Sequence, residues 1–214
     1  MADRVVRKLS VAVGLVAVLL GAGLALAQRS ATAEAERLVE TLGLRPGDAV
    51  ADIGAGAGDM SVAIADVLGP RSRVYATEIS AARLEEIRAA TSEAGLGNVT
   101  VLEAHATRTN LPEACCDAIF VRRVYHHFGD PAAMHESIRR SLKPGGRFAV
   151  LDFPHRRSTT DFVPPEQRAS GDTHGVNADT VLKELTEAGF EDVRLVTEDW
   201  PGGMFLVMAR NPES

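Results

Sequence analysis

Cysteine is scarce in this sequence: the chain has two, and they are adjacent, Cys115 and Cys116. Adjacent cysteines cannot join distant parts of a chain, and a bridge between them would be strained, so a fold built on disulfides is excluded. No group of residues has the spacing of zinc ligands. We expect two small buried thiols that lie just before a strand.

A dense stripe of lysine and arginine is also missing. The net charge is −6, and because the first 27 residues contribute +2, the remainder carries −8. Nucleic-acid binding usually requires a basic face, so the sequence predicts a small, neutral or cationic substrate rather than DNA or RNA. Without repeats or low-complexity tracts, 214 residues with 24% charged and 45% hydrophobic side chains fit a single folded domain.

The N-terminus has the layout of an export signal. Arg4, Arg7 and Lys8 precede an uncharged run over residues 9–27, which ends in the small-residue pattern Ala-Leu-Ala. The run is close to the roughly 20 residues that span a bilayer, so it could also remain as an anchor. We therefore divide the chain into a signal peptide or membrane anchor (1–27) and a domain (28–214). The basic residues favour a domain outside the inner membrane, periplasmic, secreted or anchored; the alternative is the cytoplasmic face.

The most informative stretch is residues 50–59, which read Val-Ala-Asp-Ile-Gly-Ala-Gly-Ala-Gly-Asp. An apolar run ends in glycines at every second position, and an amphipathic segment follows over residues 60–68. This pattern predicts a buried strand, a tight turn and the start of a helix. Glycine allows a ligand to approach the backbone closely, and the helix N-terminus suits an anionic group. The turn is therefore expected to hold a nucleoside-bearing cofactor.

The spacing of the glycines narrows the choice of cofactor. In the dinucleotide fingerprint G-x-G-x-x-G the third glycine would fall at Asp59, so the match fails. The phosphate-binding P-loop also fails, because no Gly-Lys-Ser/Thr follows.

The pattern Asp-x-Gly-x-Gly-x-Gly from Asp52 to Gly58 resembles motif I of the class I S-adenosylmethionine (SAM)-dependent methyltransferases. The run Leu-Lys-Pro-Gly-Gly from Leu142 and the Tyr-His-His at 125–127 extend the resemblance, which covers roughly residues 42–210. It implies SAM as cofactor and a small molecule as methyl acceptor.

Strand and helix patterns alternate along the chain, which predicts an α/β fold with a parallel sheet covered by helices on both faces. Expected helices cover 32–42, 60–68, 81–94 (capped by Ser80), 131–142 and 178–188 (capped by Asn177). Expected strands cover 50–53, 73–78, 98–103, 117–121, 142–153 (after an initial turn), 191–197 and 204–209. The last two could form a hairpin around Pro-Gly-Gly. The resemblance implies a Rossmann-like, seven-stranded, mostly parallel sheet ending in this antiparallel hairpin.

Ligands of such sheets bind beyond the carboxyl ends of the strands. Glu78 ends the second strand, where a carboxylate can accept both ribose hydroxyls. His105 stands near the place where relatives carry an acid that reads adenine, and as a neutral ring it could accept the same hydrogen bond. The residues expected to hold the cofactor are Asp52, Gly54, Ala55, Gly56, Gly58, Glu78, His105 and Arg122.

Three residues after the fourth strand are the catalytic candidates: Tyr125, His126 and His127. Histidine can act as a base or as a neutral donor near pH 7, and tyrosine can close a pocket. Asp152, at the end of the fifth strand, and the polar stretch over residues 156–175 are candidates for the acceptor side.

Two other functions remain open. SAM is a cytosolic cofactor, as the resemblance implies, so an exported domain favours a non-catalytic module of the cell envelope that holds another nucleoside or a lipid headgroup. A nicotinamide-dependent oxidoreductase is the second alternative, against which the glycine spacing and the terminal hairpin argue.

Overall fold

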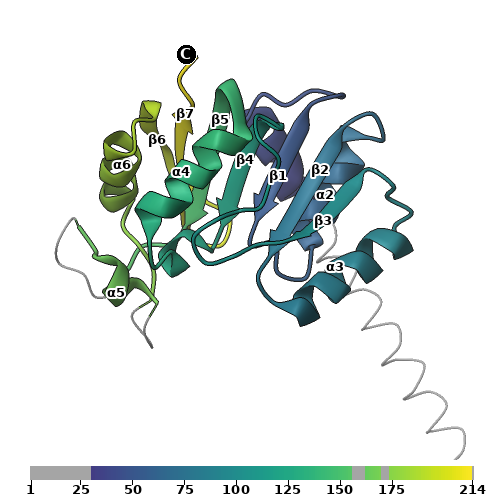
Figure 1. Ribbon diagram of the computed structural model, residues 1–214, viewed down its shortest axis with the longest axis horizontal. Coiled ribbons are helices and arrows are strands. Elements are labelled where there is room, and N and C mark those ends of the chain that lie inside the picture. The colour runs from purple at the N-terminus through teal and green to yellow at the C-terminus, as the bar shows by residue number, and fades with distance from the viewer. Residues whose placement is uncertain (1–29, 156–161, 170–173, 214) are drawn as a thin grey trace, which may run out of the picture.

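The computed structural model describes residues 30–155, 162–169 and 174–213, and Figure 1 shows their arrangement. The predicted signal peptide or anchor over residues 1–27 lies outside the described residues. Seven strands form one sheet in the order β3-β2-β1-β4-β5-β7-β6. The strands are β1 (Ala49–Ile53), β2 (Arg73–Glu78), β3 (Val99–Glu103), β4 (Cys116–Arg122), β5 (Leu142–Asp152), β6 (Glu191–Trp200) and β7 (Met204–Arg210).

The helices are residues 30–41, α2 (Asp59–Leu68), α3 (Ala81–Glu93), α4 (Pro131–Ser141), the short α5 (Pro165–Arg168) and α6 (Ala178–Glu187), with a 3₁₀ turn η1 (Tyr125–His127). Ser80 caps α3 as expected, since its hydroxyl accepts the N–H of Arg83, and Asp130, which was not predicted as a cap, accepts that of Ala133. Helix α6 begins where expected, but the amide oxygen of Asn177 accepts the His155 N–H. None of these described helices is both long and apolar enough to cross a membrane.

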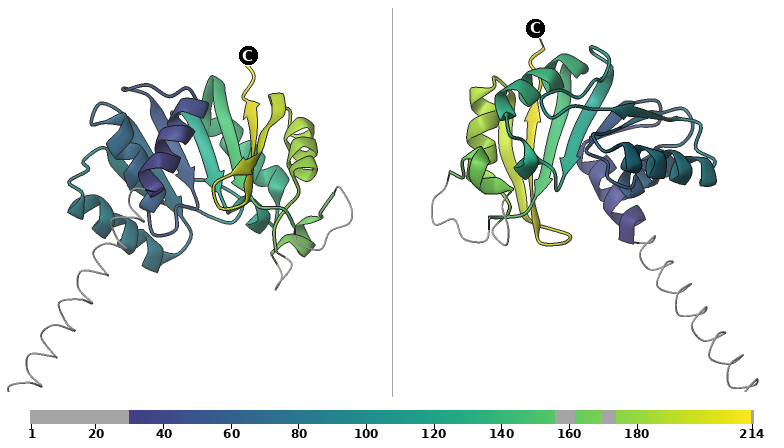
Figure 2. Two further views of the ribbon diagram at one scale, coloured as in Figure 1. Left: turned by 180° about the vertical axis from the view of Figure 1, so that it is seen from behind. Right: turned by 60° about the horizontal axis from the view of Figure 1, so that its bottom comes forward.

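The sheet separates two apolar cores because successive strand residues point to opposite faces. In β5, Phe148 and Val150 pack against α4 and α6, whereas Ala149 and Leu151 belong to the core under α2 and the helix over residues 30–41. Helices α4 and α6 lie in front of the sheet in Figure 1, and the purple helix over residues 30–41 covers the other face in the rear view of Figure 2. The predicted three-layer architecture is confirmed.

The C-terminal hairpin is confirmed as well: β7 pairs antiparallel with both β5 and β6. The structure differs from the prediction in three places. Strand β5 already begins at Leu142, so the Lys-Pro-Gly-Gly run lies inside the strand, where the register with β4 shifts. Strand β6 extends to Trp200, and residues 165–168 form a helical turn inside the polar stretch over residues 156–175, where no helix was predicted.

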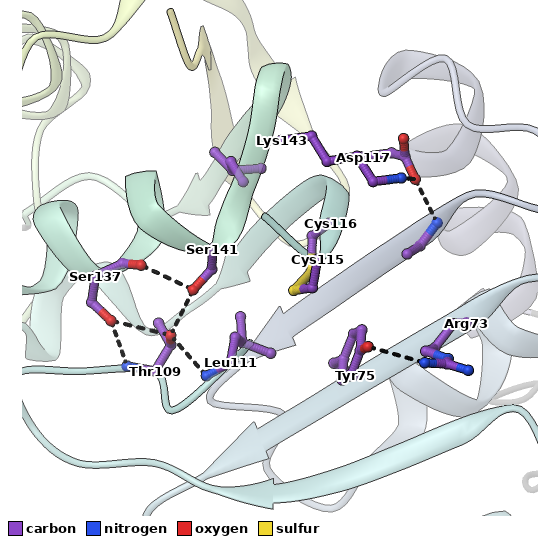
Figure 3. Close-up of a disulfide and its surroundings, with 12 residues drawn as sticks. Arg73, Tyr75, Thr109, Leu111, Cys115, Cys116, Asp117, Ser137, Ser141 and Lys143 are labelled. Carbon is purple, nitrogen blue, oxygen red and sulfur yellow. Dashed lines mark hydrogen bonds and ion pairs between the residues drawn. A yellow bond between two sulfur atoms is a disulfide. The ribbon is translucent and has the colours of Figure 1, made fainter. Parts of the chain in front are cut away.

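Cys115 and Cys116 form a vicinal disulfide at the start of β4 (Figure 3), so the expectation of two free thiols is wrong. Cys116 is buried and Cys115 is partly buried. The next residue, Asp117, accepts the N–H of Ala49 at 2.8 Å and pairs with the Lys143 ammonium at 2.7 Å. These contacts join β1, β4 and β5 at the amino-terminal end of β4, opposite the carboxyl ends of the parallel strands.

We expect Asp117→Asn to lower the free energy of unfolding by about 1–2 kcal/mol, because a charge-assisted acceptor is lost. Burial raises the pKa of Asp117, but the Ala49 N–H and Lys143 outweigh it and leave the pKa below its usual value. The variant should therefore have a lower free energy of unfolding than wild type at pH values above the pKa of Asp117 in the unfolded state. This difference should disappear as the pH falls through the pKa of Asp117 in the folded state. Urea denaturation at several pH values measures it. The matched control is Glu136→Gln, whose pair with Arg140 is exposed; an equal loss in both variants would contradict the prediction.

Candidate active site at the carboxyl ends of the strands

The glycine turn after β1 is held against the end of β2. The N–H groups of Gly54 and Ala55 both donate to the carbonyl of Thr77, at 2.8 and 3.0 Å. Gly54, Gly56 and Gly58 have φ values of 71°, 59° and 91°, which side chains rarely adopt. The alternating glycines of the sequence therefore match a backbone that requires them.

Gly54 also has no room for a side chain. A Cβ at this position would lie 2.7 Å from a methyl carbon of Val124, in the segment that joins β4 to η1. At Gly56 nothing would lie within 4 Å of a Cβ, so this part of the turn is open. The turn thus packs tightly against the β4 side and leaves space at its centre.

Glu78 lies at the end of β2 with its carboxylate turned back to the glycine turn. One carboxylate oxygen accepts the Gly56 N–H at 3.0 Å, and the other accepts the N–H groups of Ile79 and Ser80 at 2.7 and 3.1 Å. Three backbone donors fix the carboxylate without using all of its lone pairs. A pair of ribose hydroxyls would find it already oriented.

A cavity of about 200 Å³ lies between the glycine turn, the ends of β2 and β3, and η1. Its walls are mainly apolar, as is usual for sites that hold a nucleoside. It is lined by Ile53, Gly54, Glu78, Ile79, Ala104, His105, Ala106, Val124, His127, Phe128 and Met134. Four of these (Gly54, Glu78, His105 and His127) were predicted from the sequence. The apolar wall was missed because nothing in the sequence distinguishes such residues from core.

A larger and more open hollow of about 900 Å³ lies between α4 and α6. Its walls include charges of both signs and none of the predicted cofactor residues. Because it lies away from the glycine turn, we place the functional site at the smaller cavity.

Asp52 lies beneath the turn and is 2% exposed. Its carboxylate accepts the hydroxyl of Ser61 at 2.7 Å. Burial raises the pKa of Asp52 to about 6, although the Ser61 hydrogen bond and the charge of Arg122 oppose the rise. The side chain is thus an anion near neutral pH whose charge is poorly compensated by the protein alone. A cationic ligand group beside it would relieve that cost.

Arg122 was predicted to bind the cofactor, but its guanidinium is bonded to a protein carboxylate. It makes a two-pronged ion pair with Glu34 in the helix over residues 30–41, at 2.7 and 2.8 Å. The indole N–H of Trp200 donates to the same carboxylate at 3.1 Å. Arg122 therefore acts on the site through the charge of Asp52 and by holding the first helix to the sheet.

The three catalytic candidates face different surroundings. Tyr125 is fully buried, and its hydroxyl donates to Glu184 at 2.7 Å and contacts His135 at 3.0 Å. Burial and the charge of Glu184 raise the pKa of Tyr125 well above its ordinary value. Tyr125 is not among the residues of the cavity wall, and these contacts favour a structural role.

Glu184 also anchors the short helix α5. The fully buried guanidinium of Arg168 pairs with both Glu184 oxygens, and its Nε donates to the carbonyl of Val163 at 2.7 Å. The carbonyl of Arg168 in turn accepts the N–H of Gly175 at 2.9 Å. Arg168 thus ties the segment around α5 to α6 and to Gly175, a role that sequence reasoning missed.

His127 lies at the cavity, and the ring of the buried His126 lies next to it, with ring centroids 4.0 Å apart. His127 lines the cavity and is accessible to solvent, whereas His126 is 3% exposed and bonded to Asp152 at the end of β5. Partial burial and the neighbouring His126 lower the pKa of His127, so its ring is neutral at pH 7. An unusual backbone precedes them: Arg123 has a φ of 59° at the end of β4.

The strand order, the C-terminal antiparallel hairpin and the glycine cradle with an acid after β2 together define a class I SAM-dependent methyltransferase fold. The family described as "Methyltransferase domain" matches residues 51–150. A ubiquinone/menaquinone biosynthesis C-methyltransferase UbiE from Teredinibacter turnerae is 34% identical over 116 residues, which cover 54% of this chain and 47% of the relative. This chain spans about half the length of such curated relatives.

Solved structures agree. A SAM-dependent methyltransferase from Aquifex aeolicus matches with a TM-score of 0.70 and 26% identity, covering 83% of this chain and 89% of the other. The [4+2]-cyclase SpnF matches with the same TM-score at 18% identity, covering 86% and 82%. The family match and these structures support a class I SAM-dependent methyltransferase, and SAM is the cofactor of such proteins. Because the same fold also serves a cyclase, the reaction must be argued from the site.

We expect Gly54→Ala to destabilise the protein more than Gly56→Ala. Both positions have a positive φ, which costs about 1–3 kcal/mol for a side chain, but only residue 54 would also collide with Val124. Urea denaturation compares the two variants. Adding Val124→Ala should rescue much of the difference at residue 54 and none at residue 56; equal losses in both single variants would contradict the contact.

We expect Asp52→Asn to raise stability while weakening SAM binding. At pH 8 the amide avoids the cost of a buried charge, so the free energy of unfolding should rise by about 1–2 kcal/mol. Because the folded-state pKa is raised, this advantage should shrink as the pH falls from about 6 toward 4. Thermal melting and calorimetric titration of SAM measure the two effects; a variant that binds SAM as tightly as wild type would remove Asp52 from the site.

Proposed function

We propose that this protein transfers a methyl group from SAM to a small-molecule acceptor. The observation that carries the proposal is the carboxylate of Glu78, fixed by the glycine turn at the wall of an apolar cavity. The site also satisfies a steric test: the turn is open at Gly56, where a ligand could approach the backbone. The strand ends therefore suit the nucleoside of SAM.

Each part of the site has a distinct task in this proposal. Glu78 accepts the ribose hydroxyls, the apolar wall and His105 receive the adenine, and the anionic Asp52 attracts the cationic amino-acid end. SAM supplies a methyl group on a positively charged sulfur, which a nucleophile can attack in line. The protein contributes mainly orientation and exclusion of water, and His126 and His127 lie on the side from which an acceptor would come.

The identity of the acceptor is left open by this proposal. The curated relatives are C-methyltransferases of ubiquinone and menaquinone biosynthesis, but this chain covers only about half of the length of these relatives. The net charge of −6 supports a small molecule over a nucleic acid.

We also propose that the domain over residues 28–214 is exported, or anchored at the membrane by residues 1–27; methyl transfer outside the inner membrane then requires that SAM is delivered there. The basic residues followed by the apolar run support this, and so does the vicinal disulfide, since disulfides persist mainly in oxidising compartments. Fractionation of cells that produce the full chain tests it. Recovery of the protein in the cytosol at its full mass would overturn the proposal.

Calorimetric titration of SAM and S-adenosylhomocysteine tests the enzymatic proposal. We expect micromolar binding of both and a loss of at least tenfold in Glu78→Ala, because the ribose loses a charged acceptor. The matched control is Glu103→Ala, which removes an exposed carboxylate paired in register with Glu78 on β3. A folded protein that binds neither ligand would overturn the proposal and favour the non-catalytic envelope module.

A further inference from the structure

His126, in η1, and Asp152, at the end of β5, form a buried pair. Asp152 is 0% exposed and His126 is 3% exposed. The carboxylate of Asp152 lies 2.9 Å from His126 Nδ1 and also accepts the backbone N–H of His126 at 3.1 Å. Two contacts with one carboxylate fix both the position and the rotation of the imidazole ring.

This pairing determines which ring nitrogen can react. The Asp152 carboxylate also accepts the backbone N–H groups of His126 and Phe153, so it is the acceptor of the pair and Nδ1 is the donor. The lone pair then lies on Nε2, at the opposite edge of the imidazole. No hydrogen bond to Nε2 is found among the described residues. His126 thus resembles a base whose tautomer is set by a carboxylate partner.

The pair adjoins the wall of the cofactor cavity through neighbouring residues of its own segment. Val124 and His127, on either side of His126 in the sequence, both line the cavity. The rings of Phe153 and His174, from two other segments, have centroids 4.9 and 5.7 Å from that of His126. A proton acceptor in this setting is oriented by the protein and shielded from water.

We propose that His126, oriented by Asp152, is the general base of the reaction and that the acceptor is a phenol or enol hydroxyl. The inference rests on the proposed methyl transfer and specifies its acceptor. Nε2 takes the hydroxyl proton as a bond forms between the acceptor and the methyl carbon. The carbon–sulfur bond breaks, its electron pair stays on sulfur, and S-adenosylhomocysteine leaves. The proton on the imidazolium, next to Asp152, then passes to solvent.

The pKa of the acceptor group, compared with that of an imidazole base, selects this class of acceptor. General-base catalysis is most useful when the proton to be removed is held moderately tightly. A phenol, with a pKa of about 10, is within reach of an imidazole, whereas an alkyl hydroxyl, close to water at about 15.7, is not. A thiol ionises appreciably by itself near pH 8, and a neutral amine attacks before it loses a proton. Among these groups, the deprotonation of a phenol or enol hydroxyl is therefore accelerated most by the His126–Asp152 pair.

2-Naphthol is a suitable probe because its acidity is close to that of phenol and its ionisation shifts its absorption to longer wavelength. In the presence of saturating S-adenosylhomocysteine, we expect the wild-type protein to bind the probe as the naphtholate at a pH where the free probe is mostly protonated. His126→Gln and Asp152→Asn should reduce the bound naphtholate at least tenfold. Asp117→Asn, at the opposite end of β4, should leave it unchanged.

The affinity for S-adenosylhomocysteine separates the two proposals. A wild-type protein that does not bind it contradicts the proposed methyl transfer itself. A protein that binds it but fails to bind or ionise the probe, or a His126→Gln variant that ionises the probe as well as wild type, overturns the role of the pair and the acceptor class alone. Retained binding of S-adenosylhomocysteine by the variants shows that they are folded.

A measurement on the unmodified protein supports the same test if a variant does not fold. Nitrogen-15 NMR distinguishes the two neutral tautomers of histidine. We expect His126 to carry its proton on Nδ1 at pH 8. A proton on Nε2 would leave no lone pair directed away from Asp152, and would overturn the proposal.

Discussion

The contact between Gly54 and Val124 is the constraint on which the site depends. It brings the glycine turn of β1 against the segment that leads from β4 to His126 and His127. The glycine turn and the two histidines are therefore built on neighbouring strands whose ends touch. Because close-packed groups transmit small displacements, a shift of the glycine turn also moves the segment that carries the two histidines. Methyl transfer depends on the spacing of these two segments, since donor and acceptor atoms must meet in line.

Much of the architecture could be predicted because local signals and the long-range fold agree. Alternating strand and helix patterns gave the parallel sheet, and Ser80 and the glycine turn marked helix boundaries that the structure confirms. The glycine turn after β1 was predictable for the same reason: its three positive φ values favour glycine, and the three glycines are visible in the sequence. Glu78 follows from its position at the end of a strand.

Other parts of the site depend on which segments the fold brings together. Arg122 looked like a ligand-binding residue because it ends β4, but its partner Glu34 lies 88 residues away in the chain. Tyr125 is next to two histidines at the cavity, yet the 3₁₀ turn directs its hydroxyl to Glu184, far along the sequence. The pairing of Asp152 with His126 likewise appears only when the ends of β4 and β5 are placed side by side.

The anchoring of Arg168 has a consequence for how such a protein could evolve. The segment around α5 is tied to α6 by the buried pair of Arg168 with Glu184 and by the Val163 N–H, which donates to Thr180, and it is tied to Gly175 by a backbone hydrogen bond. Loops over a rigid scaffold tolerate changes in sequence and length. Substitutions on either side of Arg168 could therefore alter which molecules are accepted while the histidines stay in place. New specificities would be accessible by few mutations, without redesign of the cofactor cradle.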